Sequence, residues 1–134
     1  MSEARPKTLS VEATWQGGYR CLVSARGHEI QVDEPLGAGG DDTGPQPSEV
    51  FLASLASCFT LALYHVARKR DLTLEDLSVR ATGEYDGPRF VRLCLEVTTS
   101  SPRVAVEPLV EPAKRVCYVS NTLRAVSDVE VTLA

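Results

Sequence analysis

Several features that mark common classes of protein are scarce in this chain of 134 residues. Basic residues are outnumbered, with 14 Lys and Arg against 18 Asp and Glu, which gives a net charge of −4. That balance argues against a nucleic-acid partner, because binding to phosphates normally needs a basic face. The first ten residues, MSEARPKTLS, lack the apolar core of a secretory signal. We therefore expect a cytoplasmic protein, a compartment in which thiols stay reduced.

The cysteines lack the spacing of the common cysteine motifs. The 4 cysteines form no Cys-x-x-Cys pair, so zinc-ribbon and thioredoxin-like sites have no support. Internal repeats and low-complexity stretches are also missing. The hydrophobic content of 43% is typical of a folded globular protein and argues against a chain that is disordered throughout. The length suits one domain over residues 1–134.

One long apolar run dominates the middle of the chain. Residues 50–67 carry no charge and are followed by a basic Arg-Lys-Arg sequence, which just reaches the length of a membrane span. Hydroxyl residues and His65 interrupt the run, however, and we expect a buried central helix instead of a membrane contact. Pro47 suits the first helical position and Glu49 the first turn, so the pattern predicts a helix from Pro47 to Lys69 or Arg70.

The flanking segments alternate between apolar and polar residues, as strands do. Residues 14–33 predict strands with a hairpin turn at residues 26–28, and residues 34–47 predict a loop because they are rich in Gly and Pro. Residues 77–97 predict a second strand pair, joined around residues 86–88. Beyond the prolines of residues 102–112 we expect a helix over residues 113–119, one further turn to residue 125, and a last strand over residues 129–133.

This order of elements indicates an α+β domain. The central helix has no polar face, whereas one chain offers only a sheet and a short helix to cover it. We therefore expect a homodimer in which a second copy buries the helix.

Two cysteines are candidates for chemistry. Cys58 lies about 16 Å from the start of the predicted helix, too far for the helix dipole, so a thiolate there needs a nearby stabilising group. It is otherwise a small core residue. Cys117 lies close to Lys114 and Arg115, whose charges favour a thiolate, although packing alone would also explain it. His65 is about 10.5 Å from Cys58 along the helix, too far for a direct hydrogen bond.

Two stretches of the chain resemble a known family. The sequences Asp-Glu-Pro at residues 33–35, Gly-Gly at residues 39–40, GPQPSE at residues 44–49 and LASC at residues 55–58 resemble the OsmC/Ohr family. The sequence CYVSNTL at residues 117–123 is similar to the second cysteine motif of that family. The resemblance covers essentially the whole chain. It implies an OsmC-like fold, with antiparallel sheets wrapped around a long buried central helix in an intertwined homodimer.

The resemblance also implies an activity, that of a thiol-dependent peroxidase acting on organic hydroperoxides in oxidative-stress defence. Cys58 would attack the peroxide and become a sulfenic acid, and Cys117 would then condense with it to a disulfide. A dithiol reductant would reopen the disulfide. No metal and no organic cofactor is implied.

The chain departs from the family pattern at two positions, Ser48 and Tyr118. Ser48 stands where the best-characterised members carry a Glu directly after the proline, and Glu49 follows one residue later, as in a divergent branch. Glu49 could equally serve only the helix dipole. Arg20 falls roughly where the family has an Arg that positions the thiolate, and Tyr118 replaces a common proline.

Two other functions fit the same residues. The apolar helix could line the pocket of a non-catalytic binding protein for hydrophobic small molecules. Alternatively, the two cysteines could form the disulfide of a thiol redox sensor.

Overall fold

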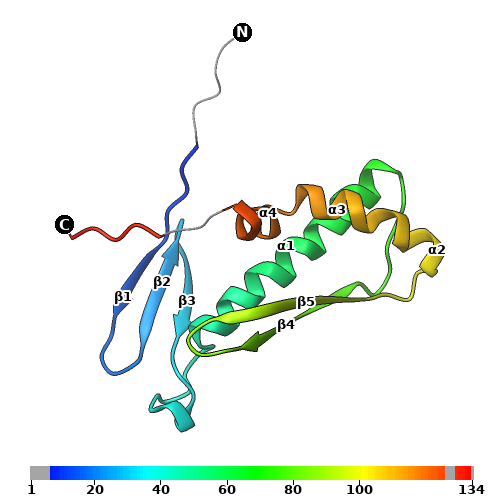
Figure 1. Ribbon diagram of the computed structural model, residues 1–134. Helices are drawn as coiled ribbons and strands as arrows, with labels where there is room; N and C mark the ends of the chain where they lie inside the picture. Colours follow the sequence, from blue (N-terminus) through cyan, green and yellow to red (C-terminus); the bar gives the residue numbers. More distant parts are fainter. Residues whose placement is uncertain (1–6, 126–128, 134) are drawn as a thin grey trace. The chain divides into compact units, whose positions relative to one another are not determined.

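Three short strands form an antiparallel sheet in the computed structural model of the chain, which describes residues 7–125 and 129–133 (Figure 1). The elements are β1 (Glu12–Trp15), β2 (Cys21–Ala25) and β3 (His28–Val32), followed by one 3-10 turn, η1 (Leu36–Ala38). Arg26 and Gly27 join β2 to β3 with φ angles of 52° and 86°, as a two-residue hairpin turn requires. The predicted turn at this point is confirmed.

The connection between β1 and β2 differs from the prediction. The sequence pattern places Tyr19 in a strand, but the structure places it in a tight turn after Gly17 and Gly18. These glycines have φ angles of 99° and 55°, a conformation that other residues rarely adopt. The turn is closed by hydrogen bonds from the Arg20 N–H to the Gly17 carbonyl (3.1 Å) and from the Trp15 indole to the Gly18 carbonyl (2.9 Å). The alternation of apolar and polar residues does not reveal this turn, because the residues of the turn continue the alternating pattern of a strand.

A buried carboxylate organises the loop that follows β3. Asp33 accepts hydrogen bonds from the backbone N–H groups of Glu34 (2.8 Å), Asp41 (3.2 Å) and Thr43 (3.1 Å), and from the Thr43 hydroxyl (2.7 Å). Burial raises the pKa of Asp33, but these hydrogen bonds, led by those of Thr43, outweigh burial and hold the pKa below its ordinary value. The loop is tight as well, since a Cβ at Gly40 would lie 2.0 Å from the Glu34 carbonyl oxygen.

Helix α1 (Pro47–Lys69) begins where the sequence predicts. The Glu49 carboxylate accepts a hydrogen bond from the Gln46 N–H (3.1 Å), and the Gln46 carbonyl accepts from the N–H groups of Glu49 (2.9 Å) and Val50 (3.0 Å). These bonds satisfy backbone groups that a helix start otherwise leaves unpaired. The chain divides into two compact units between Val50 and Phe51, so α1 begins in the first unit and continues in the second.

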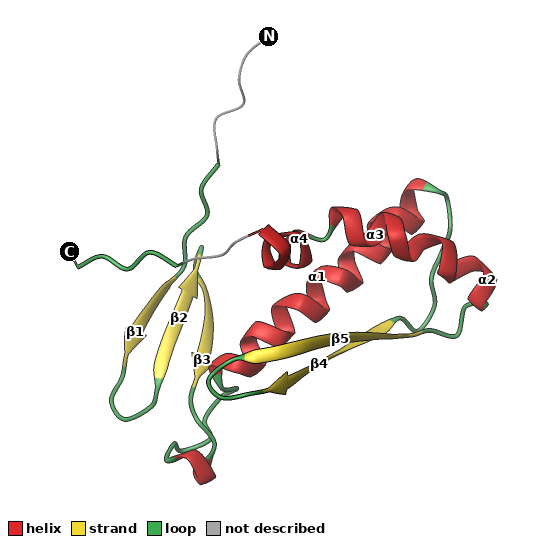
Figure 2. Cartoon of the chain, viewed as in Figure 1, coloured by secondary structure: helices red, strands yellow, loops and turns green. Residues whose placement is uncertain are grey.

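The second unit contains the predicted strand pair, β4 (Ser78–Tyr85) and β5 (Phe90–Thr98), paired antiparallel (Figure 2). The Asp86 N–H donates to the Arg89 carbonyl at 3.0 Å across the connecting turn. A β-bulge shifts the register so that Tyr85 lies opposite Phe90, and the side chain of Val91 is exposed.

The helical region near the C-terminus begins earlier than predicted. It consists of α2 (Arg103–Val106), η2 (Glu107–Leu109), α3 (Val110–Val116) and α4 (Tyr118–Ala125). The prolines do not prevent helix formation because each one lies at an N-cap or within a first turn, where a backbone N–H is not needed. The single helix expected over residues 113–119 is wrong: Cys117 is extended (φ −80°, ψ 103°) and separates α3 from α4.

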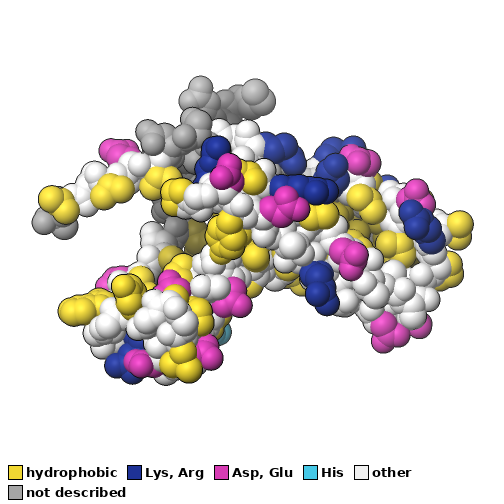
Figure 3. Space-filling model, turned by 60° about the horizontal axis from the view of Figure 1, so that its bottom comes forward, with side chains coloured by type: hydrophobic (Ala, Val, Ile, Leu, Met, Phe, Trp, Pro, Cys, Tyr) yellow, Lys and Arg dark blue, Asp and Glu magenta, His cyan; other side chains and the backbone are white. Residues whose placement is uncertain are grey.

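One side of α1 forms the core of the second unit. Its buried residues pack with α3, η2 and the inner face of β4 and β5, in a cluster of Phe59, Ala62, Leu63, Val66, Ala67, Leu109, Ala113 and Cys117. The other side of the helix is open: Leu61 is 65% exposed and Tyr64 is 59% exposed. Hydrophobic side chains also reach the surface elsewhere in the chain (Figure 3). The α+β class with antiparallel sheets is confirmed.

Helix α1 is also long and apolar enough to cross a membrane. It alone meets that condition among the described residues, by length and composition, and 33% of the apolar window is buried within the chain. A core helix of a soluble protein has the same composition.

The last strand expected over residues 129–133 is not formed. These residues belong to neither sheet of the described chain, and the side chains of Val131 and Leu133 are exposed. The alternation of Val129, Val131 and Leu133 fits a strand, but a strand forms only where a neighbour pairs with its backbone.

Replacing Asp33 tests the role of the buried carboxylate. We expect Asp33→Asn to lower the urea midpoint of unfolding, because the amide presents an N–H group to backbone donors. The depressed pKa means that Asp33 contributes stability above its unfolded-state pKa and loses it as the pH falls through the folded-state value. The matched control is Asp41→Asn on the exposed side of the loop. Equal midpoints for the two variants would contradict this role.

Candidate functional site

The break between α3 and α4 brings two of the four cysteines together. The Cys117 side chain is fully buried and forms a hydrogen bond with the side chain of Cys58, which is half-buried on α1. Both are free thiols. All the elements involved belong to the second unit. The structure therefore shows a contact between Cys58 and Cys117 that the spacing of the residues in the sequence does not establish.

The start of helix α4 surrounds this sulfur pair with hydrogen-bond donors. Cys117 directly precedes α4, and its carbonyl accepts the Asn121 N–H at 3.0 Å, as the carbonyl of an N-cap residue does. Its sulfur faces the backbone N–H groups of Val119 and Ser120 and the Ser120 side chain, all of which lower its pKa, and the Ser120 hydroxyl also donates to the Cys117 carbonyl at 3.2 Å. The Cys58 sulfur accepts from the N–H groups of Val119 and Tyr118. A sulfur atom thus takes the place that a Ser, Thr or Asp oxygen takes at other helix starts.

These contacts move the pKa values of the two thiols in opposite directions. Burial raises the pKa of Cys117, but hydrogen bonds from Ser120, Cys58 and Val119 outweigh burial and lower the pKa below its ordinary value. Burial raises the pKa of Cys58, and the hydrogen bond and negative charge of Cys117 raise it further. A negative charge on the pair is therefore favoured at Cys117, where the donors at the start of α4 stabilise it.

Cys58, unlike Cys117, opens onto a pocket. The pocket has a volume of about 430 Å³ and is lined by Cys58, Leu61, Ala62, His65, Val116 and Tyr118. Most of this lining is apolar. A small molecule in the pocket would meet Cys58, whereas Cys117 does not line this pocket and is fully buried.

The other two predicted site residues belong to the first unit. Glu49 caps the start of α1, the role that the helix dipole alone explains. Arg20 lies between the Gly17–Gly18 turn and β2, and it forms no ion pair within the described part of the chain. On an ideal helix Glu49 lies about 13.5 Å before Cys58 and half a turn away from it.

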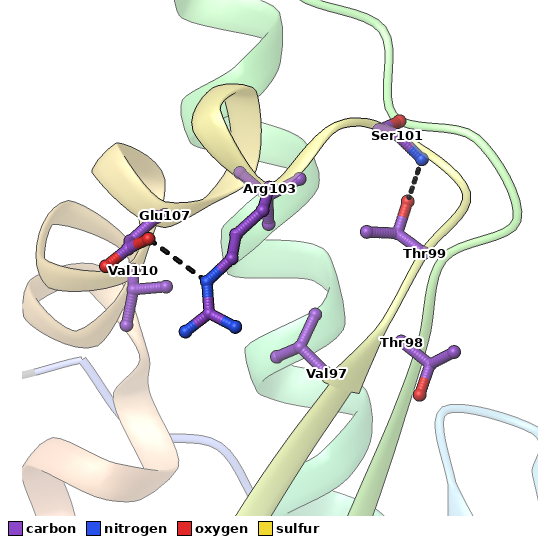
Figure 4. Close-up of a pocket in the computed structure, with 8 residues that line it drawn as sticks. Val97, Thr98, Thr99, Ser101, Arg103, Glu107 and Val110 are labelled. Carbon is purple, nitrogen blue, oxygen red and sulfur yellow. Dashed lines mark hydrogen bonds and ion pairs between the residues drawn. The ribbon is translucent and has the colours of Figure 1, made fainter.

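A second pocket of about 410 Å³ offers less chemistry. It lies at the end of β5 beside α2, where Arg103 and Glu107 form an ion pair at 3.2 Å (Figure 4). Both side chains are largely exposed, and the pocket contains no nucleophilic thiol. Within residues 7–125 and 129–133, no group of three His, Cys, Asp or Glu side chains could hold a metal ion.

The sequence analysis missed the donors that stabilise the sulfur pair. Ser120 follows Cys117 by three residues, the spacing at which the N-cap and N3 positions of a helix interact. That spacing could have indicated a helix start at Tyr118, but the apolar pattern through Val119 suggested a continuous helix. Backbone N–H donors carry no signal in the sequence.

Titration of the thiols tests the coupling. We expect Cys117→Ser to lower the pKa of Cys58 relative to its value in the wild type, because the neighbouring negative charge is removed. Alkylation rates as a function of pH, with the alkylated residue identified by mass spectrometry, measure this pKa. The control is Cys94→Ser, which replaces an exposed thiol elsewhere. A Cys58 pKa that is unchanged by Cys117→Ser would contradict the coupling.

Comparison with known proteins gives consistent results. The chain is similar to the organic hydroperoxide resistance protein of Xanthomonas axonopodis pv. citri (strain 306), with 31% identity over 144 aligned residues that cover 100% of both chains. It is 32% identical over 132 residues to the organic hydroperoxide resistance protein OhrB of Bacillus subtilis (strain 168), covering 93% of this chain and 97% of that protein.

A solved structure shows the same fold. The organic hydroperoxide resistance protein OsmC from Legionella pneumophila superposes with a TM-score of 0.68 at 26% identity, covering 91% of this chain and 93% of that one. The family model described as OsmC-like protein matches residues 39–132, a range that includes both Cys58 and Cys117. The chain therefore belongs to the OsmC-like family, as its cysteine motifs indicate.

Proposed function

We propose that the protein is a thiol-dependent peroxidase that reduces organic hydroperoxides in the cytoplasm as part of oxidative-stress defence. The observation that carries this proposal is the contact of Cys58 with Cys117 at the start of α4, beside an apolar pocket. Relatives named for organic hydroperoxide resistance support the same substrate class. Residues 1–134 then act as one OsmC-like domain, and the chemistry needs only sulfur and an external dithiol.

In the first step, Cys58 reduces the peroxide. Proton transfer within the hydrogen-bonded pair places the negative charge on Cys58 and the proton on Cys117. The Cys58 thiolate attacks the terminal oxygen of the hydroperoxide, the O–O bond breaks, and the leaving alkoxide takes up one proton to become the alcohol. Two electrons pass from sulfur to the peroxide, and Cys58 becomes a sulfenic acid.

In the second step, Cys117 traps the sulfenic acid. The Cys117 sulfur attacks the Cys58 sulfur, a disulfide bond forms and one water molecule leaves with the former peroxide oxygen. An external dithiol then reduces the disulfide by thiol–disulfide exchange, itself becoming a disulfide and returning both cysteines to thiols. The hydrogen bond between the two side chains means that this condensation needs little movement.

The protein also acts as a homodimer in this proposal. Leu61 and Tyr64 leave an apolar side of α1 open, and a second copy would cover it. Glu49 and Arg20, which the family resemblance assigns to positioning the thiolate, belong to the first unit. Since Glu49 lies half a helical turn away from Cys58 in its own chain, these two residues would serve the sulfur pair of the partner subunit.

Replacing Cys58 tests the peroxidase activity. We expect Cys58→Ser to abolish turnover of tert-butyl hydroperoxide with a dithiol reductant, because a hydroxyl is too weak a nucleophile at neutral pH. Peroxide consumption measures the effect. Cys94→Ser should retain the activity of the wild type, since that thiol lies on the exposed face of β5. Equal activity of Cys58→Ser and the wild type would remove the proposal.

Peptide mapping tests the role of Cys117. After one equivalent of organic hydroperoxide, we expect a Cys58–Cys117 disulfide in the wild type, detected by mass spectrometry without reduction. In Cys117→Ser, Cys58 should stop at the sulfenic acid or pass to the sulfinic acid after about one turnover. A wild-type protein that accumulates sulfenic acid without this disulfide would exclude Cys117 as the resolving cysteine.

Sedimentation tests the homodimer. We expect the wild type to sediment as a dimer at micromolar concentration, and Tyr64→Asp to shift it towards monomer by placing a charge on the apolar side of α1. Val104→Asp on α2 is the control and should remain dimeric. A monomeric wild type at this concentration would contradict the proposal.

A further inference from the structure

Ser120 faces the buried Cys117 and also lines a pocket that is distinct from the one beside Cys58. This pocket, which we call the β5 pocket, has a volume of about 490 Å³ and belongs to the second unit alone. Its lining includes Phe59, Leu95, Val110, Lys114, Ser120 and Arg124. The two pockets share no lining residue, and Cys117 lines neither of them. A hydroperoxide at Cys58 and solvent at Ser120 therefore reach the pair of thiols from different pockets.

The Ser120 hydroxyl has one proton and two acceptors within reach, and both acceptors belong to Cys117. In the structure the hydroxyl donates to the Cys117 carbonyl at 3.2 Å, and the same side chain faces the Cys117 sulfur. The carbonyl already accepts a hydrogen bond from the Asn121 N–H at 3.0 Å. The hydroxyl can therefore turn from the carbonyl to the sulfur without leaving the carbonyl unpaired.

A negative charge on the sulfur favours the second of these acceptors. A hydrogen bond to an ionised group is roughly twice as strong as one between neutral groups, so the hydroxyl turns to the sulfur when Cys117 is a thiolate. The backbone N–H groups of Val119 and Ser120 also face this sulfur, but their directions are fixed by helix α4. The hydroxyl is thus the donor that responds to the charge on Cys117.

We propose that Ser120 is a positioning residue for disulfide formation, whose hydroxyl holds the Cys117 thiolate ready to attack the oxidised Cys58. This inference rests on the proposed peroxidase function and specifies what protects its reactive cysteine. After Cys58 has reduced a hydroperoxide, the leaving alkoxide takes the proton of Cys117, and Ser120 stabilises the thiolate that remains. The thiolate attacks the Cys58 sulfur, an S–S bond forms, the S–O bond breaks, and the departing hydroxide takes a proton from solvent to become water.

The rate of this attack decides the fate of Cys58. A sulfenic acid that is not captured reacts with a second hydroperoxide, which gains two electrons and becomes a second alcohol, while Cys58 becomes a sulfinic acid. A dithiol does not reduce a sulfinic acid, so each such event removes one site from the cycle. By favouring capture, Ser120 would therefore set the amount of hydroperoxide that the protein withstands.

The Ser120 hydroxyl also has a local role that needs no redox chemistry. Serine and threonine hydroxyls commonly donate to the carbonyl three or four residues earlier in the chain. Thr122 does so in the same helix, since its hydroxyl donates to the Tyr118 carbonyl at 2.7 Å. Thr122→Ala therefore removes an equivalent hydrogen bond from α4 and is the matched control for Ser120→Ala. Ser120→Thr keeps the hydroxyl, and the β5 pocket has room for the added methyl group.

Single-turnover oxidation tests the positioning role. With one equivalent of tert-butyl hydroperoxide, we expect Ser120→Ala to oxidise Cys58 no more slowly than the wild type but to form the Cys58–Cys117 disulfide about tenfold more slowly. With excess hydroperoxide, mass spectrometry should find sulfinic acid at Cys58 after fewer turnovers. Ser120→Thr should restore the rate, and Thr122→Ala should keep it. An unchanged rate of disulfide formation in Ser120→Ala, or an equal loss in Thr122→Ala, would overturn the inference.

A redox equilibrium distinguishes failure of this inference from failure of the peroxidase proposal. Diamide oxidises the Cys58–Cys117 pair, and equilibration with dithiothreitol then reports on the thiolate whether or not the protein reduces peroxides. Because Ser120 stabilises the reduced, ionised state, we expect Ser120→Ala to make the disulfide about tenfold harder to reduce, a potential about 30 mV lower. An unchanged equilibrium in Ser120→Ala would overturn the inference even if peroxide turnover is robust.

The pH dependence of the same equilibrium separates the hydroxyl from a general effect on the fold. The difference between Ser120→Ala and the wild type should shrink as the pH falls, because a protonated Cys117 gives the hydroxyl no charge to stabilise. The charged or titratable groups that contact Cys117 or line the β5 pocket are all retained in this variant, namely Cys58 on α1, Cys94 on β5, Lys114 on α3 and Arg124 on α4. A difference that is the same at every pH would overturn the inference.

Discussion

The hydrogen bonds from the first N–H groups of α4 to two sulfur atoms are the interaction on which the site depends. A buried thiolate is unfavourable without such donors, because burial raises the pKa of both Cys58 and Cys117. The donors are available because the chain is extended at Cys117 and a new helix starts directly after it. Hydrogen bonds from the Ser120 side chain and N–H, from the Cys58 thiol and from the Val119 N–H together lower the pKa of Cys117.

Packing of α1 then decides which of the two sulfur atoms a substrate can reach. The side of α1 that carries Phe59, Leu63 and Val66 is held in the core, which leaves Cys58 at the edge between buried and open surfaces. Cys117 is enclosed behind it. Cys58 is thus the accessible thiol, and Cys117 is the thiol whose negative charge is stabilised. Transfer of a proton from Cys58 to Cys117 moves the negative charge to the accessible sulfur. This division favours a reaction at Cys58 followed by its capture by Cys117.

The parts of the fold governed by local chemistry could be predicted from the sequence. Pro47 and Glu49 mark the start of α1, and Arg26-Gly27 marks a hairpin turn, because each acts through its own backbone. The apolar pattern continues through Val119 and so predicts a continuous helix, and only the three-residue spacing of Cys117 and Ser120 indicates the break at Cys117 in the sequence. The pairing of Cys58 with Cys117 came from family resemblance, and the donors of α4 from the structure alone.

The position of Cys117 also constrains how sequences with this fold can diverge. An N-cap needs a short side chain with an acceptor atom, and serine meets that requirement as well as cysteine does. Exchanging one sulfur for oxygen would therefore preserve the helix start while removing the redox partner. A substitution at this residue can therefore remove the redox activity and leave the fold intact, so an inactive relative with the same fold can arise by one substitution.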